Sequence, residues 1–416
     1  MSTNKRIYLC LAHMSGEEQK YIKEAFDTNW VVPLGPNVNG FEADLEAYIG
    51  EGKHVVALSS GTAALHLALI ALGVGCDDEV LCQSFTFCAS ANPITYLGAK
   101  PIFIDSEPDT WNMDAELLEA AICDRIQKCG RKPKAIIPVY LYGMPANIEA
   151  IMAIGRKYDI PVIEDAAEAF GSVYNGRMCG TFGEYGVLSF NGNKMITTSG
   201  GGALICPSRE AKERIMFYAT QAREAYPYYQ HEQIGYNYRM SNICAGIGRG
   251  QMTIAHEHVA HHQRLHQLYA ELLADIDGVE LHHNPNELYE SNYWLTAITL
   301  DPKLRVRGEE LAYNKAIEGA IGGAAGTTHR AKTIETDCQP NANVEALRIA
   351  LDGAGIEARP LWKPMHKQPV FKDAAAYLNG TSEELFLRGL CLPSGPCVTE
   401  DDVRYVVATI QANIIG

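Results

Sequence analysis

The sequence predicts an α/β protein in which a mostly parallel central sheet is flanked by helices and a smaller α+β domain follows. Between about residues 50 and 205, short β-rich runs alternate with helical patterns, which is typical of parallel sheets covered by helices. A long helix with a polar face is expected from about residue 252 to 273, and the composition shifts again after residues 293–295. We therefore expect a large domain over residues 1–255, and a connecting helix with a small domain over residues 256–416.

The predicted strands are short apolar runs. They cover residues 55–58, 80–82, 102–104, 135–139, 162–163 and 186–188. Because ligands bind at the carboxyl ends of the strands in such sheets, polar residues that directly follow these runs are candidate site residues. The segment from about 305 to 343 is rich in Gly, Ala, Thr and charge but weakly periodic, so we expect it to include a mobile surface insertion.

Composition narrows the class of protein. The 416 residues are too many for one typical core. A net charge of −15 without a Lys/Arg-rich run argues against nucleic acid or an acidic membrane surface as a partner. The apolar stretch that ends near residue 12 is too short for a signal core or a membrane span. The 12 cysteines are scattered without a C-x-x-C pair, as expected of buried thiols in a reducing compartment. These features predict a cytoplasmic protein.

Lys194 is the strongest clue to chemistry. It closes the run Ser-Phe-Asn-Gly-Asn-Lys at residues 189–194, and three glycines follow at residues 200–202. A lysine held between a strand and a glycine-rich turn can be partly desolvated, which favours the neutral amine that attacks a carbonyl. Pyridoxal phosphate is the obvious carbonyl partner. The alternative is an exposed loop lysine, so the cofactor hypothesis also needs a phosphate site and a partner for a pyridine ring.

Two strand ends offer those parts. Gly61 and Thr62 follow the strand at 55–58 and open a helix, where free N–H groups and the helix dipole can bind phosphate. The alternative there is a plain helix cap. Asp165 follows the strand at 162–163, where a buried carboxylate is costly unless it is paired. A protonated pyridine nitrogen would be such a partner, and a helix-capping aspartate is the alternative.

Three other patterns are weaker. Phe85 and Phe87 follow a strand, so one ring could stack on a planar cofactor while the other packs in the core. Residues 236–242 combine amide, guanidinium and hydroxyl groups, which suits anion binding or a subunit edge. His258, His262 and His266 share one helical face, which we expect to be solvated or hydrogen-bonded, and no metal site is predicted.

Taken in order, these motifs carry a resemblance. They are Ser-Gly-Thr at 60–62, Glu-Asp-Ala-Ala-Glu at 164–168, the run at 189–194 with its glycines, and Gly-Tyr-Asn-Tyr-Arg-Met-Ser-Asn at 235–242. Over nearly its whole length the chain resembles the DegT/DnrJ/EryC1/StrS aminotransferases. The resemblance implies a fold-type I pyridoxal phosphate enzyme, a homodimer with shared active sites, that aminates keto sugars attached to nucleotides.

The resemblance also implies residue roles. Lys194 would be the Schiff-base lysine and Asp165 the partner of the pyridine nitrogen. The remaining cofactor contacts would come from Gly61, Thr62 and Ser189 at the phosphate, Phe87 stacked on the ring, Glu168 near the ring hydroxyl, Asn191 beside the lysine, and Asn237, with Arg239 as a second candidate, from the neighbouring subunit.

The finer resemblance is to the sugar C4-aminotransferases of the UDP-N-acetylbacillosamine pathway. Many family members have histidine where this chain has Asn191, and that subgroup has asparagine. The runs at residues 30–35, 359–366, 376–380 and 392–395 also look like that subgroup. The expected reaction transfers the amino group of L-glutamate to C4 of a UDP-linked 2-acetamido-2,6-dideoxy-4-keto-hexose and releases 2-oxoglutarate. The Lys194 amine would carry the transferred proton.

Local groups are needed to bind the diphosphate of such a substrate, because the protein is acidic. Lys363, His366 and Arg239 are candidate counter-charges, and Trp362 could pack on the base or the sugar. The alternatives are amination of another nucleotide-linked keto sugar, of the perosamine or pseudaminic acid type, and a pyridoxal phosphate-binding regulatory protein without turnover. A sugar dehydratase of the same fold is disfavoured, because such members tend to replace the lysine with histidine.

Overall fold

The computed structural model describes residues 6–313 and 338–415. The mobile insertion expected within residues 305–343 falls mostly on residues 314–337, which lie outside the described part. The helices are α1 Glu18–Asp27, α2 Pro36–Ile49, α3 Gly61–Ala71, α4 Asn92–Tyr96, α5 Ala115–Cys129, α6 Ile148–Tyr158, α7 Arg209–Ala219, α8 Asn242–Met252, α9 Ala255–Leu273, α10 Ala342–Gly353, α11 Thr381–Arg388 and α12 Glu400–Asn413.

The strands alternate with these helices through the first half of the chain. They are β1 His54–Leu58, β2 Glu79–Gln83, β3 Lys100–Ile104, β4 Ala135–Ile137, β5 Ile163–Asp165, β6 Val173–Tyr174, β7 Arg177–Met178, β8 Tyr185–Ser189, β9 Gly202–Cys206, β10 Val279–Leu281, β11 Tyr289–Glu290, β12 Thr296–Leu300, β13 Arg305–Val306, β14 Arg359–Pro360, β15 Ala376–Tyr377, β16 Gly389–Leu392 and β17 Ile414–Ile415. All six strands predicted from the sequence are present, with small shifts at their ends.

A mostly parallel sheet forms the centre of the molecule. Two four-stranded sheets, in the orders β1-β9-β8-β5 and β15-β3-β2-β4, are joined edge to edge by parallel bridges from Ile136 to Val162 and from Val139 to Asp165. Only the pairs that involve β9 are antiparallel. The carboxyl ends of β1, β2, β4, β5 and β8 therefore meet along one edge, as the fold class predicts.

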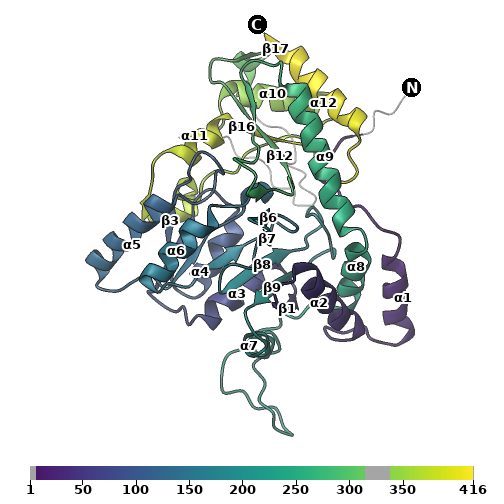
Figure 1. The fold of residues 1–416 in the computed structure, drawn as a ribbon, viewed down its shortest axis with the longest axis vertical. Coiled ribbons are helices and arrows are strands. Elements are labelled where there is room, and N and C mark those ends of the chain that lie inside the picture. The colour runs from purple at the N-terminus through teal and green to yellow at the C-terminus, as the bar shows by residue number, and fades with distance from the viewer. Residues whose placement is uncertain (1–5, 314–337, 416) are drawn as a thin grey trace.

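Both faces of this sheet are covered by helices (Figure 1). Side chains alternate along β1, so that Val55 and Ala57 join one buried cluster with α2 while Val56 and Leu58 join another with α3. Burial on both faces explains why the strands read as unbroken apolar runs. The α/β architecture of the large part of the molecule is confirmed.

A second, antiparallel sheet lies near both chain ends in the order β10-β12-β16-β14. It packs with α9, α10 and α12 around a separate apolar cluster that also takes in Ile7 (Figure 1). The helix expected from about residue 252 to 273 is α9, which begins at Ala255, just after α8 ends at Met252, and ends at Leu273. Since β15 pairs with β3, residues 376–377 extend the large sheet. A division of the chain at residue 255 stays a prediction.

The histidine face of α9 differs from a solvated face. His258, His262 and His266 are all buried. His258 hydrogen-bonds to the carbonyl oxygen of Met195, and His262 to that of Tyr293. His266 stacks on the ring of Tyr293. Of the two alternatives weighed for this face, the hydrogen-bonded one is therefore correct.

Between α7 and α8 the chain leaves the body of the molecule. In Figure 1 this teal segment projects beyond α7. Its side chains include Tyr228, Tyr229 and Ile234, which are 61%, 76% and 81% exposed. Large apolar side chains that point into solvent from a projecting segment are unusual on an isolated molecule and mark a contact surface.

Candidate active site

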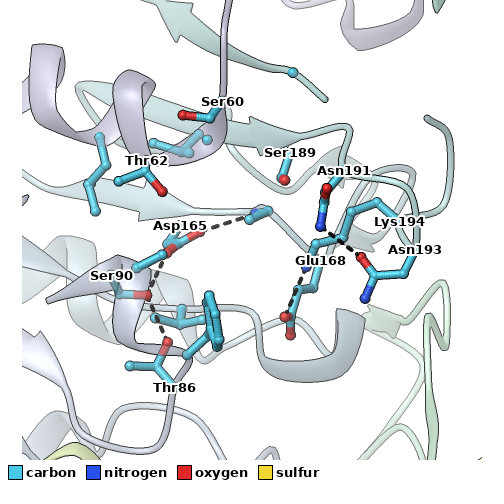
Figure 2. A pocket seen from close by; sticks show the side chains of 18 of the residues that line it. Ser60, Thr62, Thr86, Ser90, Asp165, Glu168, Ser189, Asn191, Asn193 and Lys194 are labelled. Carbon is cyan, nitrogen blue, oxygen red and sulfur yellow. Dashed lines mark hydrogen bonds and ion pairs between the residues drawn. The ribbon is translucent and has the colours of Figure 1, made fainter. Parts of the chain in front are cut away.

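A cavity of about 410 Å³ lies at the carboxyl ends of the parallel strands. Most of the residues that line it lie at or just after the ends of β1, β2, β4, β5 and β8, and two tryptophans complete the lining. They are Ser59, Ser60, Gly61, Thr62, Leu65, Thr86, Phe87, Ala89, Ser90, Val139, Asp165, Ala167, Glu168, Val187, Ser189, Asn191, Asn193, Lys194, Gly200, Gly201, Trp294 and Trp362. Eight of the predicted cofactor residues thus share one cavity (Figure 2).

The start of α3 forms one end of the cavity. The Ser60 hydroxyl caps this helix by accepting from the N–H of Ala63 at 3.0 Å. The first N–H groups of a helix have no acceptor within the helix, so they are available to an anion at Gly61 and Thr62. A Cβ on Gly202 would lie 2.3 Å from the Gly61 nitrogen. Glycine at position 202 is therefore required for β9 to pass beneath this helix start.

Asp165 also lines the cavity and is 7% exposed. One carboxylate oxygen accepts from the Ser90 hydroxyl at 2.6 Å and the other from the N–H of Ala167 at 3.2 Å. Burial raises the pKa of Asp165 above its ordinary value, and the hydrogen bond from Ser90 opposes that rise. A cationic ring nitrogen placed against this carboxylate would offset its burial.

Lys194 and Glu168 form an ion pair in the same cavity. The Lys194 Nζ lies 3.2 Å from Glu168 Oε1, and the other oxygen of Glu168 accepts from the N–H of Tyr142 at 2.7 Å. Glu168 is buried and Lys194 is partly buried, and Figure 2 shows their side chains pointing toward one another. Burial raises the pKa of Glu168, and the charge of Lys194 opposes that rise.

Two residues of the site were not found by sequence reasoning. Ser90 lies in a short turn after β2, and the face of the Trp294 ring lies 4.0 Å from the Lys194 Nζ. The Trp294 Nε1 also donates to the Asn193 carbonyl at 2.7 Å. Residues 293–295 stand out in the sequence only as a change of composition, because no local spacing relates them to Lys194.

Aromatic rings and amides line the open side of the cavity. Phe87 is 54% exposed and lies against Trp362, with ring centroids 5.4 Å apart. The N–H of Trp362 donates to the Tyr142 hydroxyl at 2.9 Å. Asn191 donates to Asn193 at 3.4 Å. This side of the cavity can take a flat or ring-shaped ligand.

Other predicted residues are held elsewhere. Arg239 is buried in an ion pair with Glu42, at 2.6 Å, and also donates to the Ala57 carbonyl, so within its own chain it does not reach the cavity. A buried guanidinium must be paired, and Glu42 supplies that charge. Asn237 is exposed at the base of the projecting segment.

Two candidate substrate residues also differ from expectation. His366 is hydrogen-bonded to the Ser84 hydroxyl at 2.7 Å. Burial lowers the pKa of His366, so it is a poor counter-charge for a diphosphate. The Lys363 amine donates to the Cys338 carbonyl at 3.0 Å. Neither residue is among those that line the cavity.

The donor set fits pyridoxal phosphate. A helix start can bind the phosphate, Asp165 can pair with the ring nitrogen, and Lys194 presents an amine to the same cavity. Glycine at position 202 keeps the phosphate end open, since any Cβ there would collide with the helix start.

Across residues 6–313 and 338–415, no helix is long and apolar enough to span a membrane.

Comparison with known proteins points the same way. The model of the DegT/DnrJ/EryC1/StrS aminotransferase family matches residues 12–320 and 309–411. A putative pyridoxal phosphate-dependent aminotransferase, EpsN of Bacillus subtilis, is 45% identical over 98% of this chain and 95% of its own. A GDP-perosamine synthase of Caulobacter vibrioides is 33% identical over the full length of both chains. A solved DegT DnrJ EryC1 StrS aminotransferase from Brucella abortus superimposes with a TM-score of 0.81, at 28% identity over 95% of each chain.

Proposed function

This chain belongs to the DegT/DnrJ/EryC1/StrS aminotransferase family, and from that premise we propose that it transfers the amino group of L-glutamate to C4 of a UDP-linked 2-acetamido-2,6-dideoxy-4-keto-hexose. Family membership itself makes the protein a pyridoxal phosphate-dependent sugar aminotransferase. The observation that carries the assignment of residues is that Lys194, Asp165 and the start of α3 line one cavity.

Bound pyridoxal phosphate supplies an aldehyde that can take up an amino group and a ring that withdraws electrons. In the proposal, the N–H groups at Gly61 and Thr62, together with the Ser189 hydroxyl, bind the phosphate. Asp165 keeps the ring nitrogen protonated, since its buried carboxylate favours a cationic partner. Phe87 covers the ring from the open side of the cavity.

Lys194 has two tasks in this proposal. Its amine would hold the cofactor in the resting enzyme, and in its free form the same amine would accept the proton from the α-carbon of the amino donor. Glu168 lies 3.2 Å from that amine, so it stabilises the protonated form that this transfer produces. The second half of the reaction, on the keto sugar, uses the same groups in reverse.

The choice of sugar rests on the open side of the cavity. Asn191 lies there where many family members have histidine, and Trp362 offers a flat surface next to Phe87. An amide can donate to and accept from hydroxyl or acetamido groups without adding charge. The cytoplasmic location remains part of the proposal, and it is supported by the 12 scattered cysteines, none of which forms a disulfide in the described structure.

A second candidate is amination of a GDP-linked keto sugar. The relative from Caulobacter vibrioides that carries the name GDP-perosamine synthase aligns with the whole of this chain. Its name gives GDP as the nucleotide, whereas the first candidate substrate carries UDP. The two candidates therefore predict different preferences within one assay.

The test is incubation of the purified enzyme and glutamate with a panel of UDP-, GDP- and dTDP-linked 4-keto sugars, followed by identification of the products by mass spectrometry and NMR. We expect an amine at C4 of the UDP-2-acetamido sugar with 2-oxoglutarate in equal amount. Turnover of the GDP sugar alone would establish the second candidate and overturn the first.

The proposal includes a homodimer with shared active sites. It is supported by the exposed apolar side chains of the segment between α7 and α8 and by Asn237, which is exposed at its base and outside its own cavity. Mixing and refolding the Lys194→Ala and Asn237→Ala variants should restore activity, because a mixed dimer contains one site with both native residues. If each variant is inactive and the mixture stays inactive, the shared site is disproved.

A further inference from the structure

We propose that Trp294 is a positioning residue that holds the Lys194 ammonium against its ring face and so sets how firmly the released amine keeps its proton. This inference rests on the proposed role of Lys194 as the lysine that bonds to the cofactor. It concerns a residue that lies 100 positions further along the chain and comes from the loop between β11 and β12.

The contact is short and buried. The Lys194 Nζ lies 4.0 Å from the centroid of the Trp294 ring, and Trp294 is 3% exposed. The face of an indole ring attracts a cation and has no comparable attraction for a neutral amine. Glu168 lies 3.2 Å from the ammonium, and the Lys194 charge also acts on the buried Asp165 carboxylate and on the buried Cys10 thiol.

The ring is tied to the segment that carries the lysine. Its Nε1 donates to the carbonyl of Asn193, the residue before Lys194, at 2.7 Å. Rotation of the ring would break that bond, so the indole face stays directed at Lys194. A phenylalanine at position 294 would retain an aromatic face but would lose this donor.

The same loop also supports Glu168. The N–H of Trp294 donates to Asn292 Oδ1 at 2.8 Å, and Asn292 Nδ2 donates to the Glu168 carbonyl at 2.8 Å. Tyr293, which lies between Asn292 and Trp294 in the chain, has a φ of +48°, and this backbone conformation is unfavourable for a tyrosine. Its ring stacks on His266 with centroids 3.5 Å apart. Such backbone strain persists only where the surroundings hold it, and here it directs Trp294 into the cavity.

The test measures the protonation of Lys194 without turnover. The cofactor-free enzyme is mixed with pyridoxal phosphate at a series of pH values. The neutral amine and the aldehyde lose one water to form a C=N bond, which cyanoborohydride reduces by adding hydride. Peptide mapping then identifies the labelled lysine. The pH at which labelling reaches half its maximal rate reports how firmly the amine keeps its proton.

Trp294→Leu should lower that half-maximal pH by about one unit, because the ammonium loses its ring partner. Trp294→Phe should lower it less, since an aromatic face remains. Trp111→Leu is the matched control: Trp111 is also buried, at 6% exposure, but it stacks on His282 away from the cavity, and its loss should leave the value unchanged. If Trp294→Leu does not fold, Trp294→Met supplies a side chain of similar length without a ring face.

A second measurement keeps an indole ring at position 294: all tryptophans are replaced by fluorinated tryptophan, and the half-maximal pH is determined again. Fluorine weakens the negative ring face, so the half-maximal pH should again fall. A value equal to the wild type in Trp294→Leu, or equal shifts in the Leu and Phe variants, would overturn the inference. Label found on a lysine other than Lys194 would instead disprove the proposed function on which the inference rests.

Discussion

The Ser90 hydroxyl lies 2.6 Å from a carboxylate oxygen of Asp165 and donates a hydrogen bond to it. The Thr86 hydroxyl lies 2.7 Å from the Ser90 oxygen. Because the Ser90 proton is directed at Asp165, Thr86 must be the donor in that second bond. The hydroxyls of Thr86 and Ser90, which both follow β2, thus stabilise the ionised form of the buried Asp165 carboxylate at the end of β5.

Ser90→Ala should weaken cofactor binding by roughly 10- to 100-fold, because a hydrogen bond to a charged group is worth about 1.5–3 kcal/mol. Fluorescence titration of the cofactor-free protein with pyridoxal phosphate measures this. Ser382→Ala is the control, because the Ser382 hydroxyl is also buried but has no hydrogen-bond partner. Equal affinities of the Ser90 variant and the wild type would show that Asp165 does not depend on Ser90.

Gly202→Ala should damage the phosphate end of the site. Its Cβ would lie 2.3 Å from the Gly61 nitrogen and 2.4 Å from the Ser60 carbonyl carbon, so β9 and the start of α3 must separate. We expect a loss of about 1–3 kcal/mol of stability and weaker binding of pyridoxal phosphate. In Gly200→Ala the new Cβ meets nothing within 4 Å, so thermal unfolding should change little. Equal losses of stability and of pyridoxal phosphate affinity in the two variants would contradict the steric explanation.

Arg239→Met should destabilise the protein by about 1–3 kcal/mol, because Glu42 loses its guanidinium partner and keeps only the Lys212 ammonium, 3.2 Å from its other carboxylate oxygen. The double variant with Glu42→Gln should regain part of this loss, since the buried charge that has lost one of its two partners is removed as well. Urea unfolding of the three proteins measures both values. The folded fraction of the single variant should bind pyridoxal phosphate normally, and a large loss of affinity would restore Arg239 to the list of cofactor residues.

Buried histidines predict that stability falls in acid. Burial lowers the pKa of His262 to about 3, whereas an unfolded histidine titrates near 6.5. The unfolded chain therefore binds a proton between these values that the folded chain does not, and stability falls as pH decreases from about 6.5. In His262→Asn this contribution is absent. Its stability relative to the wild type should rise by about 2 kcal/mol between pH 6.5 and pH 5, as measured by urea unfolding, whereas exposed His231→Asn should show no such trend.

Lys194→Ala should abolish turnover and remove the lysine labelled by pyridoxal phosphate and cyanoborohydride. Its amine is the group in the proposal that both holds the cofactor and moves the proton, so no neighbouring side chain substitutes for it. Lys303→Ala removes an exposed lysine at a distance from the cavity and should react at the wild-type rate. Normal turnover by Lys194→Ala would disprove the mechanism.

Much of this protein could be predicted from local patterns. Apolar runs that alternate with helical segments predicted the parallel sheet, and the polar residues directly after those runs, such as Asp165 and Gly61, line the cavity. Such predictions succeed because a strand and the turn that follows it are neighbours in the chain, and the carboxyl ends of parallel strands meet at one edge. The order of the motifs along the chain was sufficient to identify the family.

Pairings between distant segments could not be predicted in this way. Arg239 looked like an anion ligand in its local motif, yet Glu42, almost 200 positions earlier, neutralises it. No local spacing relates Ser90 to Asp165 or Trp294 to Lys194, although each pair is in contact.

The sequence by itself thus determined the fold class and the family, and it was sufficient to propose Lys194 and Asp165 as the lysine and carboxylate of the reaction. Only the tertiary structure decided which partners control the charges of those two groups. The physical reason is that hydrogen bonds, ion pairs and ring contacts act over about 3–4 Å in space, and chain folding sets that distance independently of separation along the sequence.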